Sequence, residues 1–263
     1  MTDIKHIFLT LGLLINLSFA ATPEQVEQYL LVSRAEEELI ALESQFSAMQ
    51  NAFKRHEDNK SDAYNYDMQM LSLRFKEYLE KNLSEDEMTE ILENYKNVVL
   101  LQFVSASSQA QETDNNETRA YVENLKNSPE ANERIDLVEK ISKELYSKES
   151  MIILFDELIK PLMKNGINGN QMNDEMLKLV QKDYLKTMVE NAKYETLYAS
   201  KDFTIEELEA LLKIAQTPAI DHESKAVFGA MAYALKEFFV SLTSRFDVSR
   251  HQPRNMQNRV DTK

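Results

Sequence analysis

The chain has 263 residues, with 44 acidic and 30 basic side chains and a formal net charge of −14. An acidic protein repels phosphate backbones, so the charge argues against general nucleic-acid binding. Four glycines and five prolines are too few for a turn-rich β architecture, and the composition therefore favours helices. The chain has no cysteine, which excludes disulfides, thiol catalysis and cysteine-bound metals.

Residues 1–20 have the features of a secretory signal peptide. Lys5 supplies a weak polar start, and residues 7–17 (IFLTLGLLINL) are apolar over a length too short to span a bilayer comfortably. Small residues at Ser18 and Ala20 predict cleavage after Ala20, with an uncleaved N-terminal anchor as the alternative. No later segment is apolar enough to cross a membrane, so we expect a periplasmic or secreted protein.

Apolar stripes at helical spacing fill residues 21–127, which we expect to form a first helical half. Thr22 is placed as an N-cap, with Pro23 at the first helical position and Gln25 three residues after the cap. In chain order the pattern predicts a helix from Pro23 to about Lys54, a polar loop at 55–63, a helix over 66–81, a helix from Ser84 through Phe103, a loop at 105–118 and a short helix over 119–126.

Residues 128–247 are expected to form a second helical half, with Ser128 and Pro129 marking the boundary as a cap followed by proline. Residues 248–263 are basic and carry little apolar content, so we expect a disordered tail there. In chain order the pattern predicts a helix carrying Ile135 to Leu145, a helix over 151–164 with a kink or end at Pro161, a turn at 165–170, a long helix over 172–192, a capped helix after Thr204 and a last helix over about 224–245.

Two of the predicted helix starts share one pattern. An apolar residue precedes a hydroxyl cap, a Glu three residues after the cap can reach back to its backbone N–H, and the next residue is apolar and can close a hydrophobic staple. The caps pair Ser84 with Glu87 and Thr204 with Glu207, and the staples pair Leu83 with Met88 and Phe203 with Leu208. The repetition predicts an all-α, multi-helix bundle of two related helical halves.

The residue types that usually carry catalysis or bind metals form no recognisable constellation. His222 lies between Asp221 and Glu223, but adjacent helical residues point in different directions, so we interpret this run as a solvated helix start. The acidic runs at 36–38 and 85–87 are interpreted as solvated faces and helix-dipole partners rather than paired catalytic carboxylates. We therefore expect no catalytic, cofactor-binding or metal-binding residues, and a protein that is not an enzyme.

The second capped helix carries a resemblance to a known family. Residues 203–208 read Phe-Thr-Ile-Glu-Glu-Leu and are followed by Thr217 and Pro218, which resembles the hallmark of a family of exported bacterial proteins known only as a domain of unknown function. Longer members of that family carry an earlier, degenerate copy and a mid-chain phrase, matched here by residues 74–79, 83–95, 121–125, 127–129 and 133–134. The resemblance covers most of the mature chain. It implies an exported, all-helical protein and supplies no catalytic residues.

Three functions remain open from the sequence. The absence of catalytic constellations and the Met-rich helices favour a non-catalytic interaction or chaperone-like role with another envelope protein. Met side chains also serve adaptable binding surfaces, so a lipid or other apolar ligand between the two halves is the alternative. An unrecognised hydrolase is the third. The oligomeric state has no signature in the sequence.

Overall fold

A computed structural model describes residues 19–54, 67, 69–111, 115–125, 131–164 and 172–245. The predicted apolar segment of the signal peptide, the boundary at Ser128 and Pro129, the turn at 165–170 and the basic tail lie outside these ranges. Within them every regular element is a helix, which confirms the all-α fold. The one backbone bridge in this part of the chain joins Ala20 and Ser84 in antiparallel orientation.

Helices make up nearly all of the described residues. In chain order they are α2 (Pro23–Val32), α3 (Ala35–Lys54), α4 (Gln69–Asn82), α5 (Glu85–Asn94), α6 (Val98–Gln111), α7 (Asn115–Leu125), α8 (Ala131–Leu145), α9 (Lys148–Leu154), the π-helical turn η2 (Phe155–Ile159), α10 (Lys160–Lys164), α11 (Asp174–Ala199), α12 (Ile205–Ala215) and α13 (Pro218–Arg245). Among the described residues, no helix combines the length and the hydropathy that crossing a bilayer requires.

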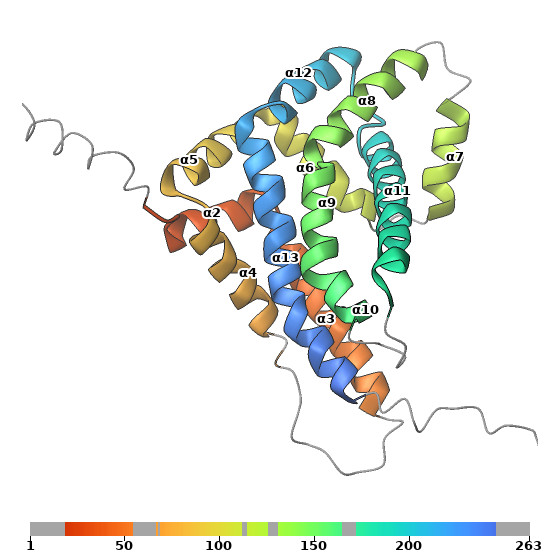
Figure 1. The fold of residues 1–263 in the computed structure, drawn as a ribbon. Helices are drawn as coiled ribbons and strands as arrows, with labels where there is room; N and C mark the ends of the chain where they lie inside the picture. Colours follow the sequence, from red (N-terminus) through yellow and green to blue (C-terminus); the bar gives the residue numbers. More distant parts are fainter. Residues whose placement is uncertain are drawn as a thin grey trace, which may run out of the picture.

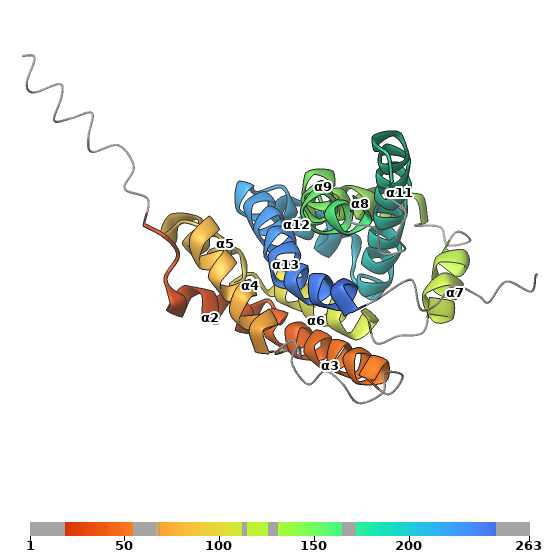
Figure 2. The same ribbon diagram turned by 60° about the horizontal axis from the view of Figure 1, so that its bottom comes forward.

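Helix α13 packs against α4, α5, α8, α9, η2 and α12 (Figure 1). Helices α4 and α5 lie along one side of α13 and α9 along another, and Figure 2 shows the same arrangement from a second direction. One cluster of buried side chains extends from Ala21 to Phe238 and includes residues of both predicted halves. The two halves therefore share a core, while their relation as copies stays a prediction.

The closest approach in this core is between α4 and α13. Gly229 of α13 faces Tyr78 of α4, and a Cβ at position 229 would overlap the tyrosine ring. The contact is held at its edges by Arg74, which pairs with Glu237 and lies 5.7 Å from the centre of the Tyr233 ring. A small residue at this one position lets the first and second halves come together.

The three helix starts named from the sequence form capping boxes at those residues. In each, the cap hydroxyl accepts from the backbone N–H three residues on, at 3.2 Å. The side chain of that residue accepts in return from the backbone N–H of the cap, at 3.0, 2.8 and 2.7 Å. All four proposed staple residues are buried: Leu83, Met88, Phe203 and Leu208. These residues are therefore structural, and their role is to start α2, α5 and α12.

Two predicted long helices are each broken in the structure. The helix expected from Pro23 to Lys54 stops at Ser33, because Arg34 adopts a left-handed backbone conformation with φ 61°. The helix expected from Ser84 through Phe103 stops at Tyr95 and restarts at Val98, where the backbone N–H of Val99 donates to the Asn97 side chain at 2.9 Å. Both breaks turn the chain toward the core.

The polar stretch 105–118, expected to be a loop, is largely helical. It continues α6 to Gln111 and starts α7 at Asn115. Small residues explain the error, because Ala106 and Ala110 pack against the core without adding much to the apolar pattern.

Pro161 does not end the helix, which was one of the two outcomes predicted for it. The helix passes through it by widening to the π-turn η2, in which the Lys160 N–H donates to the Phe155 carbonyl five residues back. Proline has no N–H to donate, so the local backbone adjusts rather than ends. The last helix also begins earlier than expected, at Pro218 rather than near Ser224.

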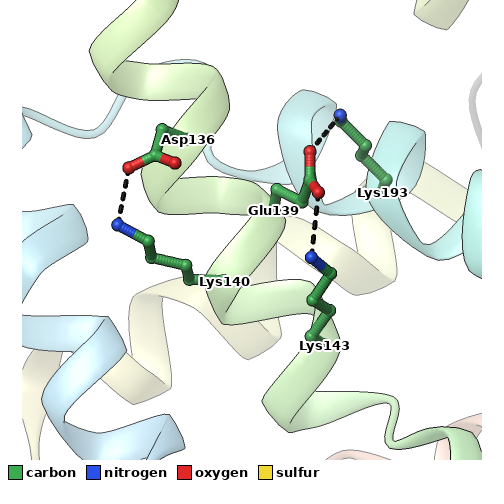
Figure 3. A network of polar contacts seen from close by, with 5 residues as sticks. All are labelled: Asp136, Glu139, Lys140, Lys143 and Lys193. Atoms are coloured by element: carbon green, nitrogen blue, oxygen red, sulfur yellow. Dashed lines mark hydrogen bonds and ion pairs between the residues drawn. The ribbon is translucent and has the colours of Figure 1, made fainter.

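An exposed ion-pair network joins α8 to α11 (Figure 3). Glu139 accepts from Lys143 on its own helix at 2.9 Å and from Lys193 on α11 at 2.7 Å. Asp136 and Lys140 form a separate pair on α8 at 2.6 Å. The two lysines lower the pKa of Glu139 to about 2. Because these groups are on the surface, the network aligns the helices more than it stabilises them.

Candidate functional site

A cavity of about 230 Å³ lies where helices of the two predicted halves meet. Helices α2, α3 and α6 contribute from the first half, and α8 and α13 from the second. Apolar side chains make most of its wall, and a few polar groups converge among them. The described lining residues are Tyr29, Ser33, Ala35, Glu38, Tyr95, Leu100, Phe103, Val104, Ser107, Leu145, Tyr146, Ile220, Glu223, Ser224, Val227 and Phe228.

Glu223 is the centre of the polar groups. Its carboxylate oxygen Oε1 accepts from the Tyr29 hydroxyl at 2.9 Å and from the Tyr95 hydroxyl at 2.5 Å. The two tyrosine rings meet edge to face, with centroids 5.9 Å apart and planes at 83°. Three separate elements, α2, the end of α5 and the first turns of α13, therefore position one carboxyl group.

Burial raises the pKa of Glu223 to about 7, although the hydrogen bonds from Tyr95 and Tyr29 act in the opposite direction. The residue keeps some exposed area because it lines the cavity, but its carboxylate lies deep in the fold. Burial and the neighbouring Glu223 also raise the pKa values of Tyr29 and Tyr95 well above their usual range. Both tyrosines thus stay neutral and act as donors at physiological pH.

Further carboxylates act on the same space. Burial raises the pKa of Tyr146, and the charges of Glu195, Glu38 and Glu223 raise it further. Glu38 and Glu223 line the cavity itself, and the described lining residues contain no Lys, Arg or His. The described lining therefore contains two carboxyl groups and no basic side chain.

A chain of serine hydroxyls fixes the wall beside Glu223. Ser224 donates to the Ser150 hydroxyl at 3.0 Å, and Ser150 shares a hydrogen bond with Ser147 at 2.7 Å. Ser147 in turn caps α9 by accepting from the Ser150 backbone N–H at 3.2 Å. All three serines are buried. Their network ties the start of α13 to the start of α9 and holds Glu223 in place.

The side chains of Asp221, His222 and Glu223 point in different directions, as predicted. Asp221 pairs with Lys225 at 2.7 Å, and His222 Nδ1 lies 3.3 Å from a carboxylate oxygen of Glu87. The interpretation as a solvated helix start is nevertheless wrong for Glu223, which enters the cavity. Among the described residues no group of three or more His, Asp or Glu side chains could hold a metal ion.

The acidic run at 36–38 has a similar outcome. Glu36 and Glu37 are exposed in the first turn of α3, as predicted, but Glu38 turns to the cavity. Helical spacing is the signal that could have identified Glu223. This residue follows Ile220 by three positions and precedes Val227 by four, so its side chain lies on the same face of α13 as theirs and lines the cavity with them.

The predicted cap and staple residues do not line the cavity, and they stabilise helices rather than form a site. No family model matches this sequence, and no curated protein or solved structure matched it either. The resemblance to an exported family stays a prediction. The function therefore has to be argued from the cavity.

Proposed function

We propose that this chain is an exported, non-catalytic binding protein that holds a small organic molecule between its two helical halves. The observation that carries the proposal is the cavity of about 230 Å³ around Glu223, Tyr29 and Tyr95. A mostly apolar pocket with a few convergent polar groups and a perturbed pKa is the usual form of a ligand site.

The size of the cavity indicates how much of a ligand it can enclose. An apolar cavity of about 150 Å³ holds benzene, so by proportion this one encloses about nine non-hydrogen atoms. The cavity is partly open to solvent, so the long acyl chain of a lipid would extend out of it. We therefore favour a compact small molecule over a lipid between the halves.

The same groups support binding better than catalysis. A glutamate whose pKa is raised to about 7 is suited to general acid or base chemistry. A serine hydrolase also needs its nucleophile activated by a base, and the described lining residues offer serines without a histidine or lysine beside them. The tyrosine hydroxyls instead hold Glu223 in one orientation, which suits recognition.

The proposal is tested by native mass spectrometry of protein purified from its own host. We expect a fraction of the protein to carry a small ligand that is lost on denaturation. Ser107→Phe fills the cavity from α6 and should abolish this bound fraction, whereas Gln102→Phe, at an exposed position of the same helix, should keep it. An unliganded mass in every wild-type preparation, or equal retention in both variants, would contradict the proposal.

A further inference from the structure

The carboxylate of Glu223 has an oxygen available to a guest. Both tyrosine hydroxyls donate to Oε1, at 2.9 and 2.5 Å, so Oε2 keeps its capacity to accept hydrogen bonds. Because Glu223 lines the cavity, a donor placed there can reach this oxygen. The site therefore suits a ligand that donates a hydrogen bond or carries a positive charge.

The charges around the cavity agree with this requirement. Glu38 lines the cavity together with Glu223, and Glu195 is close enough to act on Tyr146. None of the described lining residues is Lys, Arg or His. A carboxylate or phosphate ligand would be repelled by ionised Glu223, whereas a cation would be attracted to it.

The aromatic lining narrows the kind of cation. Five aromatic side chains surround the space, namely Tyr29, Tyr95, Phe103, Tyr146 and Phe228. Aromatic faces attract organic ammonium groups, and rings grouped around a pocket are a known way to bind them. A bare metal ion would instead require several oxygen ligands at short range, and no such cluster exists among the described residues.

We propose that the ligand is a small organic ammonium ion, paired with Glu223 and surrounded by the aromatic rings. This inference rests on the proposed function, because it assigns the class of molecule that the cavity holds. Binding brings the ammonium group to Oε2 and the alkyl part to the apolar wall formed by residues such as Leu100 and Val227. The bound cation also favours the ionised form of Glu223, since an opposite charge stabilises a carboxylate.

Isothermal titration at pH 8 with two matched probes tests the charge. Choline and 3,3-dimethylbutan-1-ol have the same shape and differ in one atom, the charged nitrogen. We expect choline to bind at least tenfold more tightly to the wild-type protein. Glu223→Gln keeps the shape of the side chain and should reduce that preference at least fivefold. Glu209→Gln removes the same charge from an exposed position on α12 and should leave it unchanged.

The outcomes separate this inference from the proposed function. Equal binding of the two probes, with loss of both in Ser107→Phe, would leave the cavity a ligand site and overturn the ammonium assignment. A choline preference that survives in Glu223→Gln would place the cation elsewhere and would also overturn it. If neither probe binds but native protein carries a ligand without an amine, the proposed function stands and this inference fails. If no ligand of any kind depends on the cavity, both fail.

Discussion

Replacing Glu223 by Gln removes a titrating proton from the cavity but keeps an oxygen that accepts from Tyr29 and Tyr95. Burial raises the pKa of Glu223 to about 7, against 4.5 in ordinary surroundings. The folded protein therefore holds this proton more tightly than the unfolded chain does. Glu223 contributes its full stability below pH 4.5, and the contribution is lost as the pH rises through about 7.

The magnitude follows from the interval between these two pKa values. Each pH unit of that interval corresponds to about 1.4 kcal/mol in the free energy of unfolding, so the upper bound is about 3 kcal/mol. The cavity admits water, which solvates the carboxylate and keeps the real value below this bound. At pH 4 the protonated Glu223 and a glutamine are nearly equivalent. At pH 8 we expect the Glu223→Gln variant to be more stable than the wild type by up to about 3 kcal/mol.

Urea unfolding of both proteins at steps from pH 4 to pH 8 measures this difference. The carboxyl groups of Glu87 and Glu139 have lowered pKa values, so they act as the pH falls below 4.5 and cancel in the comparison. Glu38 and Glu195 are present in both proteins. Glu209→Gln removes a carboxyl group from an exposed position of α12 and serves as the matched control variant. A Glu223→Gln difference that does not change from pH 4 to pH 8 would refute the assignment of a buried, proton-binding carboxyl group.

Three further outcomes are expected. Replacing the cap residue Ser84 or Thr204 by Ala should lower the free energy of unfolding in urea by about 0.5–2 kcal/mol. Gly at the same position should lower it by only a few tenths of a kcal/mol. Equal losses for Ala and Gly would contradict the capping role. Gly229→Ala should destabilise by about 1–3 kcal/mol because the methyl group meets Tyr78, and Tyr78→Phe should not relieve the clash, since the ring itself is overlapped. Glu139→Gln should lower the free energy of unfolding by at most about 1 kcal/mol at pH 7, because the carboxyl group is on the surface. The loss should fade as the pH falls from 4.5 to about 2, where the contribution of Glu139 itself is lost. A larger loss at pH 7 would show that the network is buried.

The features predicted correctly from the sequence are those that a few adjacent residues determine. A capping box needs only a hydroxyl and an acidic or amide side chain three residues apart, so Thr22, Ser84 and Thr204 could be identified without any tertiary contact. The breaks at Arg34 and Tyr95 were missed because the apolar stripe continues on both sides of each turn. Their cause is the direction that the chain must take to reach the core, which local spacing does not contain.

The cavity could not be predicted for a related reason. Tyr29, Tyr95 and Glu223 come from elements 66 and 128 residues apart along the chain, and a single sequence holds no signal that joins them. Glu223 itself could have been suspected, because it lies between apolar residues at helical spacing. Its neighbours Asp221 and His222 are partly exposed and concealed that pattern.

Helices α5 and α12 differ in the donor that binds the backbone carbonyl of the residue before the cap. The Leu83 carbonyl accepts from the backbone N–H of Ala21 at 2.9 Å. The equivalent Phe203 carbonyl accepts from the buried guanidinium of Arg134 at 2.6 Å, and the same side chain donates to the Ser200 carbonyl at 3.0 Å. Arg134 thus joins the start of α8 to the end of α11 and the start of α12, where its charge also suits the helix C-terminus.

Substitutions at Arg134 test how the start of α12 is held. Arg134→Met leaves the Phe203 carbonyl without the guanidinium donor, whereas the Ser200 carbonyl still accepts from the Phe203 backbone N–H at 3.0 Å. We therefore expect a loss of roughly 1–3 kcal/mol in unfolding free energy. Arg134→Lys can restore one of the two bonds and should cost less. The loss from Arg134→Met should be non-additive with that of Thr204→Ala, which shares the loop, and additive with that of Ser84→Ala in the other half. Additivity within about 0.5 kcal/mol for both pairs would show that the guanidinium does not position the second cap.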